Sequence, residues 1–274
     1  MLAIILEKPS DKILSLLGFS AFKDFKLYVP EHSELLEKEE DHLNYTVGTL
    51  ADVKEEFVIF LDGGVEPGKK TLGRIATCIK DNPGFDVYHL DVEGSSKFPL
   101  KAKAERIFKD VFVKEAAEAP VGSFAFRTMV VRDRVVKYQD GTLNALATVM
   151  ACAGDNGVRT VRWTKMPYSK PHVELTPEQA DARTWHRIEF LRWTEDFFGD
   201  EDYPLPVGKS FALFAEEVAK LYPARSKDEL KEIMNGFSTV NGPLRKLRAS
   251  AALKSALKER TNSISDPSGQ PVED

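Results

Sequence analysis

The stretch from Glu56 to Gly68, EFVIFLDGGVEPG, constrains the fold more than any other part of this 274-residue chain. Phe57 to Leu61 are consecutive apolar residues between turn-forming residues, in a run that is too short for a buried helix. Such a run is typical of a strand covered on both faces, as in an α/β sheet. It ends in Asp62, and a carboxylate at the carboxyl end of a buried parallel strand faces the crevice where open α/β sheets bind ligands.

Two glycines, Gly63 and Gly64, follow this aspartate. Glycine lets the backbone pass close to a bulky group, which favours a ligand site at this turn. The alternative is a plain turn between strand and helix, in which Asp62 accepts hydrogen bonds from nearby amides. The sequence leaves both interpretations open.

The composition is that of an ordinary globular protein, with 42% hydrophobic and 30% charged residues. The length suffices for one large domain, or for one domain plus a helical appendage. A net charge of -5 argues against a general nucleic-acid binder. Two cysteines make no disulfide framework, so we expect a reducing, cytoplasmic location. The first apolar run, Leu2–Leu6, is far too short for a signal-peptide core or a membrane span.

Up to residue 92 the apolar pattern predicts strands and helices in the order β-α-β-β-α-β. Short links in this alternation are the signature of a mostly parallel sheet with crossover helices. Helices are predicted after Ser10, which is placed to cap the first of them, and around Leu72. The predicted strands are Leu2–Leu6, Phe25–Val29, Phe57–Leu61 and Phe85–Val92, and Leu43–Val47 is a candidate for one further short strand.

The second half of this α/β region is predicted with fewer signals. Residues 48–55 fit one or two helical turns, and residues 101–118 fit a helix. A strand is predicted over Gly122–Val131, and a later one over Val158–Trp163, with a helix around Leu146 between them. Arg127, inside the first of these strands, is either a surface charge on an edge strand or a phosphate contact.

From about residue 171 the pattern is helical throughout. The run Thr176-Pro177-Glu178-Gln179 has capping-box spacing with proline at the first helical position, and Ser226–Glu229 is a second capping box. Ser210 is predicted to cap a helix between them, and a basic helix is predicted over Pro243–Arg260. We therefore divide the chain into an α/β domain at 1–170, a helical appendage at 171–260, and a polar tail at 261–274 that we expect to be disordered.

The α/β region resembles the family-2 glycosyltransferases, which have the GT-A fold. FVIFLDGGVEPGKKTLGRI is similar to the family's strand that ends in Asp-x-Asp, with its following proline and helix. VGSFAFRTMVVRD is similar to the strand on the family's acceptor side. YQDGTLNALATVMACAGDNGVRTVRW resembles the helix that opens with a Glu-Asp pair. The similarity covers about residues 1–165 and predicts an α/β, GT-A-like fold with a mostly parallel sheet.

This resemblance implies a glycosyltransferase that takes a nucleotide-diphosphate sugar as its donor. Asp62, Gly63 and Gly64 stand where the family binds the donor. Glu31 is placed to replace the acidic residue that contacts the nucleotide base, and Arg127 to contact a phosphate. The acceptor (a glycan, a lipid-linked sugar or a protein) is not defined by the resemblance.

The resemblance also implies a base and a metal site. Asp140 would remove the proton from the acceptor hydroxyl, although its position also fits a helix N-cap. Asp62 and Glu66 would hold a manganese or magnesium ion, weakly and only together with the donor, because Gly64 occupies the position of the family's second carboxylate.

The departures from the family support a second interpretation, a GT-A-like protein that has lost turnover and serves as a binding or scaffolding module. Glycine replaces a carboxylate at position 64, Gln139 replaces a glutamate, and Glu31 follows an altered second-strand motif. The interpretations predict the same fold, so the sequence does not decide between them.

Three further features have a structural and a functional interpretation. His89 and Asp91 share one face of a strand, as ordinary strand residues or as metal ligands. Aromatic residues between Trp185 and Phe198 form either helical core or a sugar platform. The final helix presents either a solvated face or a surface for peripheral contact with an anionic membrane. Its cations are Arg245, Lys246, Arg248, Lys254, Lys258 and Arg260.

Overall fold

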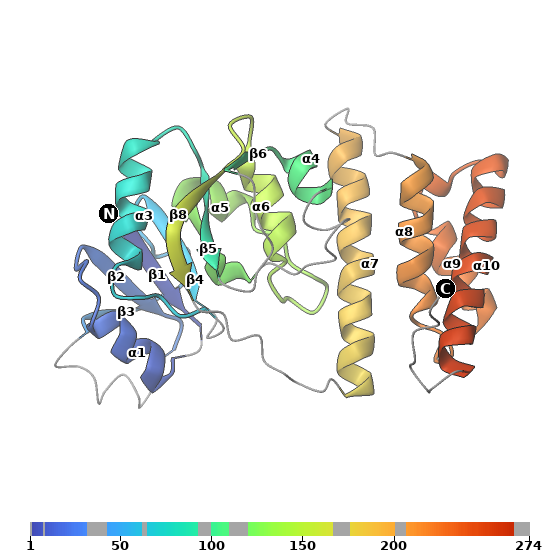
Figure 1. Ribbon diagram of the computed structural model, residues 1–274, viewed down its shortest axis with the longest axis horizontal. Helices are drawn as coiled ribbons and strands as arrows, with labels where there is room; N and C mark the ends of the chain where they lie inside the picture. The colour runs from blue at the N-terminus through green and yellow to red at the C-terminus, as the bar shows by residue number, and fades with distance from the viewer. Residues whose placement is uncertain are drawn as a thin grey trace, which may run out of the picture. The chain divides into compact units, whose positions relative to one another are not determined.

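The computed structural model describes residues 2–7, 9–31, 43–61, 65–92, 100–109, 120–166, 176–200 and 207–265. The chain forms two compact units, residues 1–172 and residues 173–274 (Figure 1). The first unit is a mixed α/β structure and the second is built from helices.

The first unit is organised around an eight-stranded sheet in the order β3-β2-β1-β4-β7-β5-β8-β6. The pairs β2–β3, β1–β2, β1–β4 and β5–β8 are parallel, whereas β7 and β6 run antiparallel to their neighbours. Up to residue 92 the observed order of the described elements is β-α-β-β-β-α-β, which is the predicted order with the short strand β3 added between β2 and β4. The strands are β1 (Leu2–Leu6), β2 (Phe25–Val29), β3 (Tyr45–Val47), β4 (Phe57–Leu61), β5 (Val87–Val92), β6 (Lys101–Ala102), β7 (Phe124–Arg127) and β8 (Val158–Met166).

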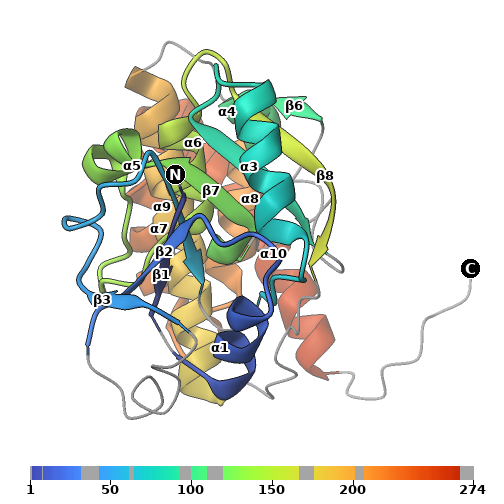
Figure 2. The same cartoon turned by 90° about the vertical axis from the view of Figure 1, so that its left-hand side faces the viewer.

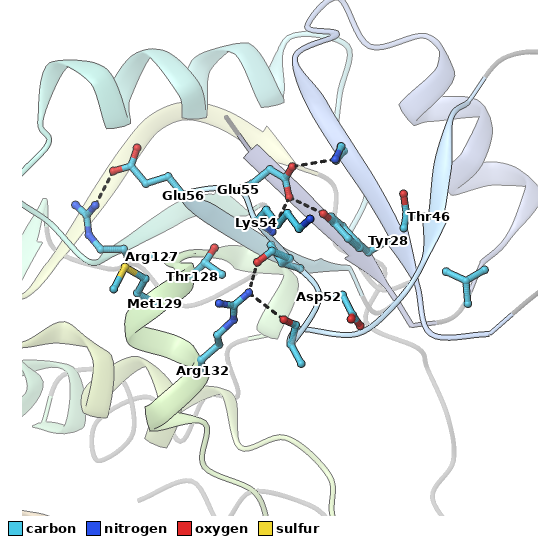
Figure 3. A pocket seen from close by; sticks show the side chains of 14 residues that line it. Tyr28, Thr46, Asp52, Lys54, Glu55, Glu56, Arg127, Thr128, Met129 and Arg132 are labelled. Carbon is cyan, nitrogen blue, oxygen red and sulfur yellow. Dashed lines mark hydrogen bonds and ion pairs between the residues drawn. The ribbon is translucent and has the colours of Figure 1, made fainter.

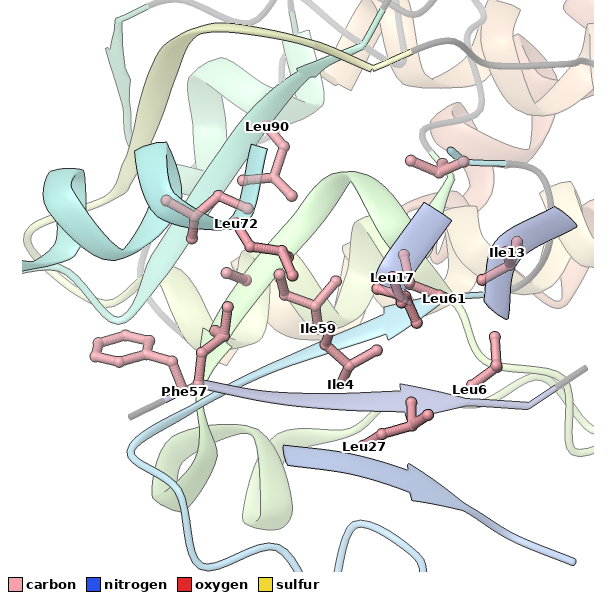
Figure 4. Close-up of a cluster of buried hydrophobic side chains, with 14 of the residues drawn as sticks. Ile4, Leu6, Ile13, Leu17, Leu27, Phe57, Ile59, Leu61, Leu72 and Leu90 are labelled. Carbon is pink, nitrogen blue, oxygen red and sulfur yellow. The ribbon is translucent and has the colours of Figure 1, made fainter. Parts of the chain in front are cut away.

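One face of the sheet carries the main hydrophobic core (Figure 4). Because side chains alternate along a strand, every second residue of β1, β2 and β4 points to this face. The helices α1 (Asp11–Gly18) and α3 (Thr71–Asp81) cover it, and α3 also packs beside β8 (Figure 2). The core includes Leu2, Ile4, Leu6, Ile13, Leu17, Leu27, Phe57, Ile59, Leu61, Leu72 and Leu90, all of them buried.

The other face of the sheet is lined by aromatic side chains. Phe124 and Phe126 of β7 lie 6.0 Å apart between ring centroids, and Phe60 of β4 makes an edge-on contact with Phe126. The helix α6 (Ala145–Ala153) packs against β5, and α5 (Thr128–Arg134) follows directly from β7. Both central faces of the sheet are therefore buried, which explains the uninterrupted apolar run of β4.

Three predictions in this unit are wrong in their extent. The predicted strand Gly122–Val131 is a short helical turn, η2 (Val121–Ser123), then β7 and then α5, so the β-branched residues after Arg127 are helical. Residues 48–55 form turns instead of a helix. Within the described part of 101–118, β6 precedes a single helical turn, α4 (Ala104–Ile107).

The second unit contains α7 (Pro177–Asp200), α8 (Val207–Ala219), α9 (Lys227–Asn235), η3 (Ser238–Val240) and α10 (Pro243–Ser265). Both capping boxes are confirmed, because Thr176 exchanges hydrogen bonds with Gln179 and Ser226 exchanges them with Glu229. Phe214 stacks on Phe237 with ring centroids 4.0 Å apart. This unit therefore has a hydrophobic core of its own.

Two boundaries in the helical unit differ from prediction. Helix α8 begins at Val207, so Ser210 lies inside it and does not cap it. Helix α10 continues to Ser265, through the first residues of the predicted polar tail. Buried Phe190 and Phe198 belong to the core of this unit, as one of the two interpretations of the aromatic residues predicted. Among the described helices, none is both long and apolar enough to cross a membrane.

Candidate functional site

The point where β1 and β4 lie side by side is the natural place for a ligand in this sheet. β1 pairs with β2 on one side and with β4 on the other, so the chain leaves the centre in opposite directions. The two strands end together, with Leu6 opposite Leu61, and the Glu7 amide donates to the Leu61 carbonyl at 3.3 Å. Ligands of open α/β sheets bind outside the carboxyl ends of the strands at such a switch point.

An ion pair spans this switch point. Lys12, in the first turn of α1, lies with its Nζ 2.5 Å from Oε1 of Glu66, which follows β4. Ser10 accepts a hydrogen bond from the Ile13 amide and so begins the helix that carries Lys12. The Lys12 side chain is 66% exposed and that of Glu66 is 15% exposed. The ammonium group is therefore held at the carboxyl edge of the sheet and remains accessible to solvent.

Sequence reasoning did not single out Lys12. The two partners are 54 positions apart, and their contact depends on the pairing of β1 with β4. The signal in the sequence was a lysine in the first turn of the helix after the first strand. It acquires meaning only when that strand is known to lie beside β4.

Asp62, Gly63 and Gly64 lie outside the described residues, so their roles stay predictions. Their flanks are well fixed, because Leu61 and Val65 are both buried. Gly122 packs tightly against this region: a Cβ at that position would lie 3.1 Å from the Phe60 carbonyl oxygen and 3.2 Å from the Val65 side chain. The glycine thus permits η2 to approach the end of β4.

Glu31 and Asp140 are both exposed. Glu31 follows β2, whose carboxyl end lies beside that of β1, so it stands at the same edge of the sheet as Glu66. Asp140 lies in a tight turn, where it accepts a hydrogen bond from the Thr142 amide at 2.9 Å. It does not cap a helix, because Asn144 caps α6 by accepting from the Ala147 amide.

The structure does not bring Arg127 to the carboxyl edge, the side of the sheet where β1 and β4 end. Arg127 lies at the amino edge, the side where these strands begin. Because β7 is antiparallel, its last residue lies opposite Phe57, the first residue of β4. The guanidinium donates to Asp86 at 2.7 Å, to Glu56 at 2.6 Å and to the Pro83 carbonyl at 2.9 Å, and it lies over the Phe57 ring. Although its burial acts to lower the pKa of Arg127, its two carboxylate partners raise that pKa overall. β7 is also an interior strand, so the edge-strand interpretation is wrong.

A pocket of about 760 Å³ lies beside Arg127, and it extends along β2 and β3 as far as Tyr28, Thr46 and Val47 (Figure 3). Its buried carboxylate, Glu55, accepts a hydrogen bond from the Tyr28 hydroxyl at 2.8 Å, and Lys26 lies 3.7 Å away. Burial alone would raise the pKa of Glu55, but the hydrogen bond from Tyr28, main-chain donors and Lys26 together lower it. Arg132 donates to the carbonyls of Leu50, Ala51 and Val53. These contacts fasten the segment before β4 to helix α5.

The described residues do not by themselves make a divalent-metal site. No group of three or more His, Cys, Asp or Glu side chains within the described ranges is arranged to hold a metal ion. Of the two predicted metal ligands, Glu66 forms an ion pair with Lys12, and Asp62 is not among the residues that the structure describes. His89 is buried in β5 against Phe124, and burial lowers its pKa to about 3, so it is a neutral core residue at physiological pH.

The chain is similar to solved structures, although its sequence matches no known family. No protein-family model and no curated protein matches this chain. Among solved structures, TarS 1-349 of S. aureus in complex with UDP is similar with a TM-score of 0.59 and 16% identity, covering 99% of this chain and 93% of that chain. The complex of the same protein with UDP-GlcNAc gives a TM-score of 0.56 at 14% identity, with the same coverage.

A third similar structure has a TM-score of 0.47 and 9% identity, and it covers 75% of this chain and 81% of that chain. It is glucosyl-3-phosphoglycerate synthase from Mycobacterium tuberculosis with manganese, UDP and glucosyl-3-phosphoglycerate. The TarS structures establish the fold, and with it the predicted fold class. The chain has a GT-A-like fold, with a mostly parallel sheet, flanking helices and C-terminal helices.

Proposed function

We propose that this protein transfers a sugar from a nucleotide-diphosphate donor to a hydroxyl group of an acceptor. The observation that carries the proposal is the Lys12–Glu66 ion pair across the β1–β4 switch point of a GT-A fold. In TarS, UDP and UDP-GlcNAc are the bound ligands. An anchored positive charge at this edge of the sheet suits the diphosphate of such a donor.

The main electrostatic task in this reaction is to stabilise the leaving diphosphate. Preorganised positive groups at the developing charge supply this stabilisation. Lys12 performs that role here, held in place by Glu66, while Asp62 contacts the ribose and Glu31 the nucleotide base. Lysine suits the role because its ammonium group is a compact charge with three donors.

The second task is to remove a proton from the acceptor, and Asp140 is the base in this proposal. Its turn is stabilised by the hydrogen bond from Thr142. The carboxylate takes the hydroxyl proton, the hydroxyl oxygen forms a bond to the anomeric carbon, and the bond from that carbon to the diphosphate breaks. The nucleoside diphosphate leaves with the bonding electron pair, and Asp140 returns its proton to solvent.

No step in this scheme passes through a metal ion. Manganese binding by Asp62 and Glu66 stays a prediction, and it requires the ammonium of Lys12 to leave Glu66. We expect negligible heat when manganese is titrated into the protein without a nucleotide. Tight binding in that titration would show that the metal ligands are elsewhere in the chain.

A thermal-shift screen with UDP, GDP, CDP and dTDP tests donor binding. A ligand at about 100 times its dissociation constant stabilises the fold by about 2.7 kcal/mol, which gives a measurable rise in Tm. Lys12→Gln should remove about half of the shift or more, as expected for binding that is at least about tenfold weaker. Lys23→Gln is the matched control, because Lys23 is an exposed lysine that follows the same helix and contacts the Gly18 carbonyl. The absence of a shift with all four nucleotides at millimolar concentration would contradict the proposal.

The alternative function is a GT-A-like binding or scaffolding protein without turnover. It is favoured by glycine at position 64 and glutamine at position 139, where the family has carboxylates. Both functions permit donor binding, so hydrolysis or transfer of the bound sugar distinguishes them. A chain that binds a nucleotide sugar tightly and leaves it intact with every glycan, lipid-linked sugar and protein acceptor tested would be the scaffold.

A further inference from the structure

The start of α10 carries large apolar side chains on its exposed side. Leu244 is 77% exposed and Leu247 is 69% exposed, one helical turn apart. The opposite side of the helix packs against α8 and α9. Its inward residues are Ala249, Leu253, Ala256 and Leu257, all buried. The two outward leucines are thus not needed for the core of the helical unit.

Cations continue the same outward side of α10. Residues spaced three or four apart share one side of a helix. From Leu244 this spacing leads through Leu247 to two lysines that are also exposed. We call this stripe the Leu244 face; its residues are Leu244, Leu247, Ala251, Lys254 and Lys258.

The charge around the Leu244 face is strongly one-sided. The helix contains six cations and a single acidic residue, Glu259. Arg245, Lys246 and Arg248 flank the two leucines and are exposed. Exposed leucines among cations form the pattern of a helix that lies in the plane of an anionic lipid surface.

We propose that the Leu244 face binds the surface of a membrane that contains anionic phospholipids. The leucines enter the boundary between headgroups and acyl chains, and the cations contact the phosphates. A second copy of the chain is a poorer occupant, because two such cationic faces repel each other. Nucleic acid would neutralise the cations, but its phosphate backbone offers no apolar environment for the leucines.

The proposal does not depend on sugar transfer, and its test uses the full chain with vesicles. Co-sedimentation is measured with phosphatidylcholine vesicles and with a one-to-one mixture of phosphatidylcholine and phosphatidylglycerol. We expect binding to the mixed vesicles and little to pure phosphatidylcholine. Binding should weaken with added salt, because salt screens the attraction between exposed charges.

Two sets of variants separate the contributions of the leucines and the cations. Leu244→Ser with Leu247→Ser should reduce vesicle partitioning at least tenfold, since each leucine transfers apolar area from water. Its control is Met129→Ser, which removes a side chain that is 76% exposed on the α/β unit and should change nothing.

Replacing Arg248, Lys254 and Lys258 by glutamine should cost about fivefold for each charge removed. The matched control removes the same charge from another part of the helical unit, at Arg225, Lys227 and Lys231, and should have a much smaller effect. Equal loss in both triple variants would reduce the effect to net charge and contradict a specific face.

Three other outcomes would overturn the proposal. The first is equal partitioning of the double-serine variant and the unmodified chain. The second is a dimer in solution that the double-serine variant converts to a monomer, because a second copy would then cover the leucines. The third is tight binding to single-stranded RNA that the serine substitutions leave unchanged, together with no binding to the mixed vesicles.

Discussion

The two edges of the central sheet differ in how their charged residues are used. At the amino edge, Arg127 engages Glu56 and Asp86, and Arg132 donates to three main-chain carbonyls. At the carboxyl edge, Lys12 contacts one carboxylate and remains largely exposed. A dense network of partners marks structural residues, whereas an anchored but accessible charge is suited to a ligand.

The contrast matters because the position of the pocket, taken alone, would suggest that the ligand binds near Arg127 and not at the carboxyl edge. The pocket of about 760 Å³ reaches from Arg127 at the amino edge along β2 and β3, and Tyr28, Thr49 and Arg127 provide partners for its carboxylates. Ligands of α/β sheets bind at carboxyl ends because strands and helix amino termini converge there. We therefore propose that the donor binds at the β1–β4 edge.

The largest effect is expected at the proposed base. Asp140→Asn should lower kcat by about 10²–10⁴-fold while leaving nucleotide binding intact, because an amide cannot accept the proton. Asparagine can still accept from the Thr142 amide, so the turn should persist. Asp155→Asn, at another exposed turn residue, is the control. Near-normal turnover by the Asp140 variant would rule out its catalytic role.

Substitution of Arg127, at the amino edge, should lower the stability of the fold and leave the activity unchanged. Arg127→Leu keeps apolar contact with Phe57 but removes charge-assisted hydrogen bonds, and it should cost about 2 kcal/mol of unfolding free energy. Lys12→Gln should cost less than about 0.5 kcal/mol, since exposed ion pairs contribute little. Urea denaturation of both variants measures the difference. Equal costs would remove the distinction between the edges.

A smaller effect concerns pH. The folded pKa of Glu55 is lowered from its ordinary value of 4.5, so its stabilising contribution is fully present above pH 4.5 and is lost as the pH falls through the folded pKa. Tyr28→Phe removes the hydroxyl that donates to this carboxylate and should cost about 1.5 kcal/mol at pH 7. The variant should also lose less stability on acidification, which denaturation at pH 7 and pH 3.5 would reveal. An unchanged pH dependence would mean that Tyr28 does not set this pKa.

The sequence predicted where strands and helices occur better than it predicted which strands lie next to each other in the sheet. The run Phe57–Leu61 could be recognised as a buried strand because five apolar residues between turn formers have few alternatives. Its partners could not be recognised, because strand pairing is decided by packing across the sheet. Arg127 shows the consequence: the antiparallel direction of β7 reverses which edge it reaches.

The residues of the candidate site also could be predicted only as far as they depend on nearby residues in the sequence. Asp140 was singled out by the family resemblance. Its alternative role as a helix cap is wrong, because Asn144 caps α6 while Asp140 accepts a hydrogen bond within a turn. Lys12 was missed because its partner is remote in sequence. Local chemistry can be predicted from local sequence, whereas a contact between two segments requires the fold.

The most direct test of the assignment compares two exposed lysines at opposite edges of the sheet. UDP is titrated calorimetrically into the unmodified protein, Lys12→Gln and Lys26→Gln, with uridine as a ligand that lacks phosphates. If the donor diphosphate lies at the carboxyl edge, Lys12→Gln weakens UDP binding by about tenfold or more and leaves uridine binding unchanged, while Lys26→Gln has no effect. A loss of UDP affinity in Lys26→Gln with full affinity in Lys12→Gln would place the nucleotide in the amino-edge pocket and contradict the assignment.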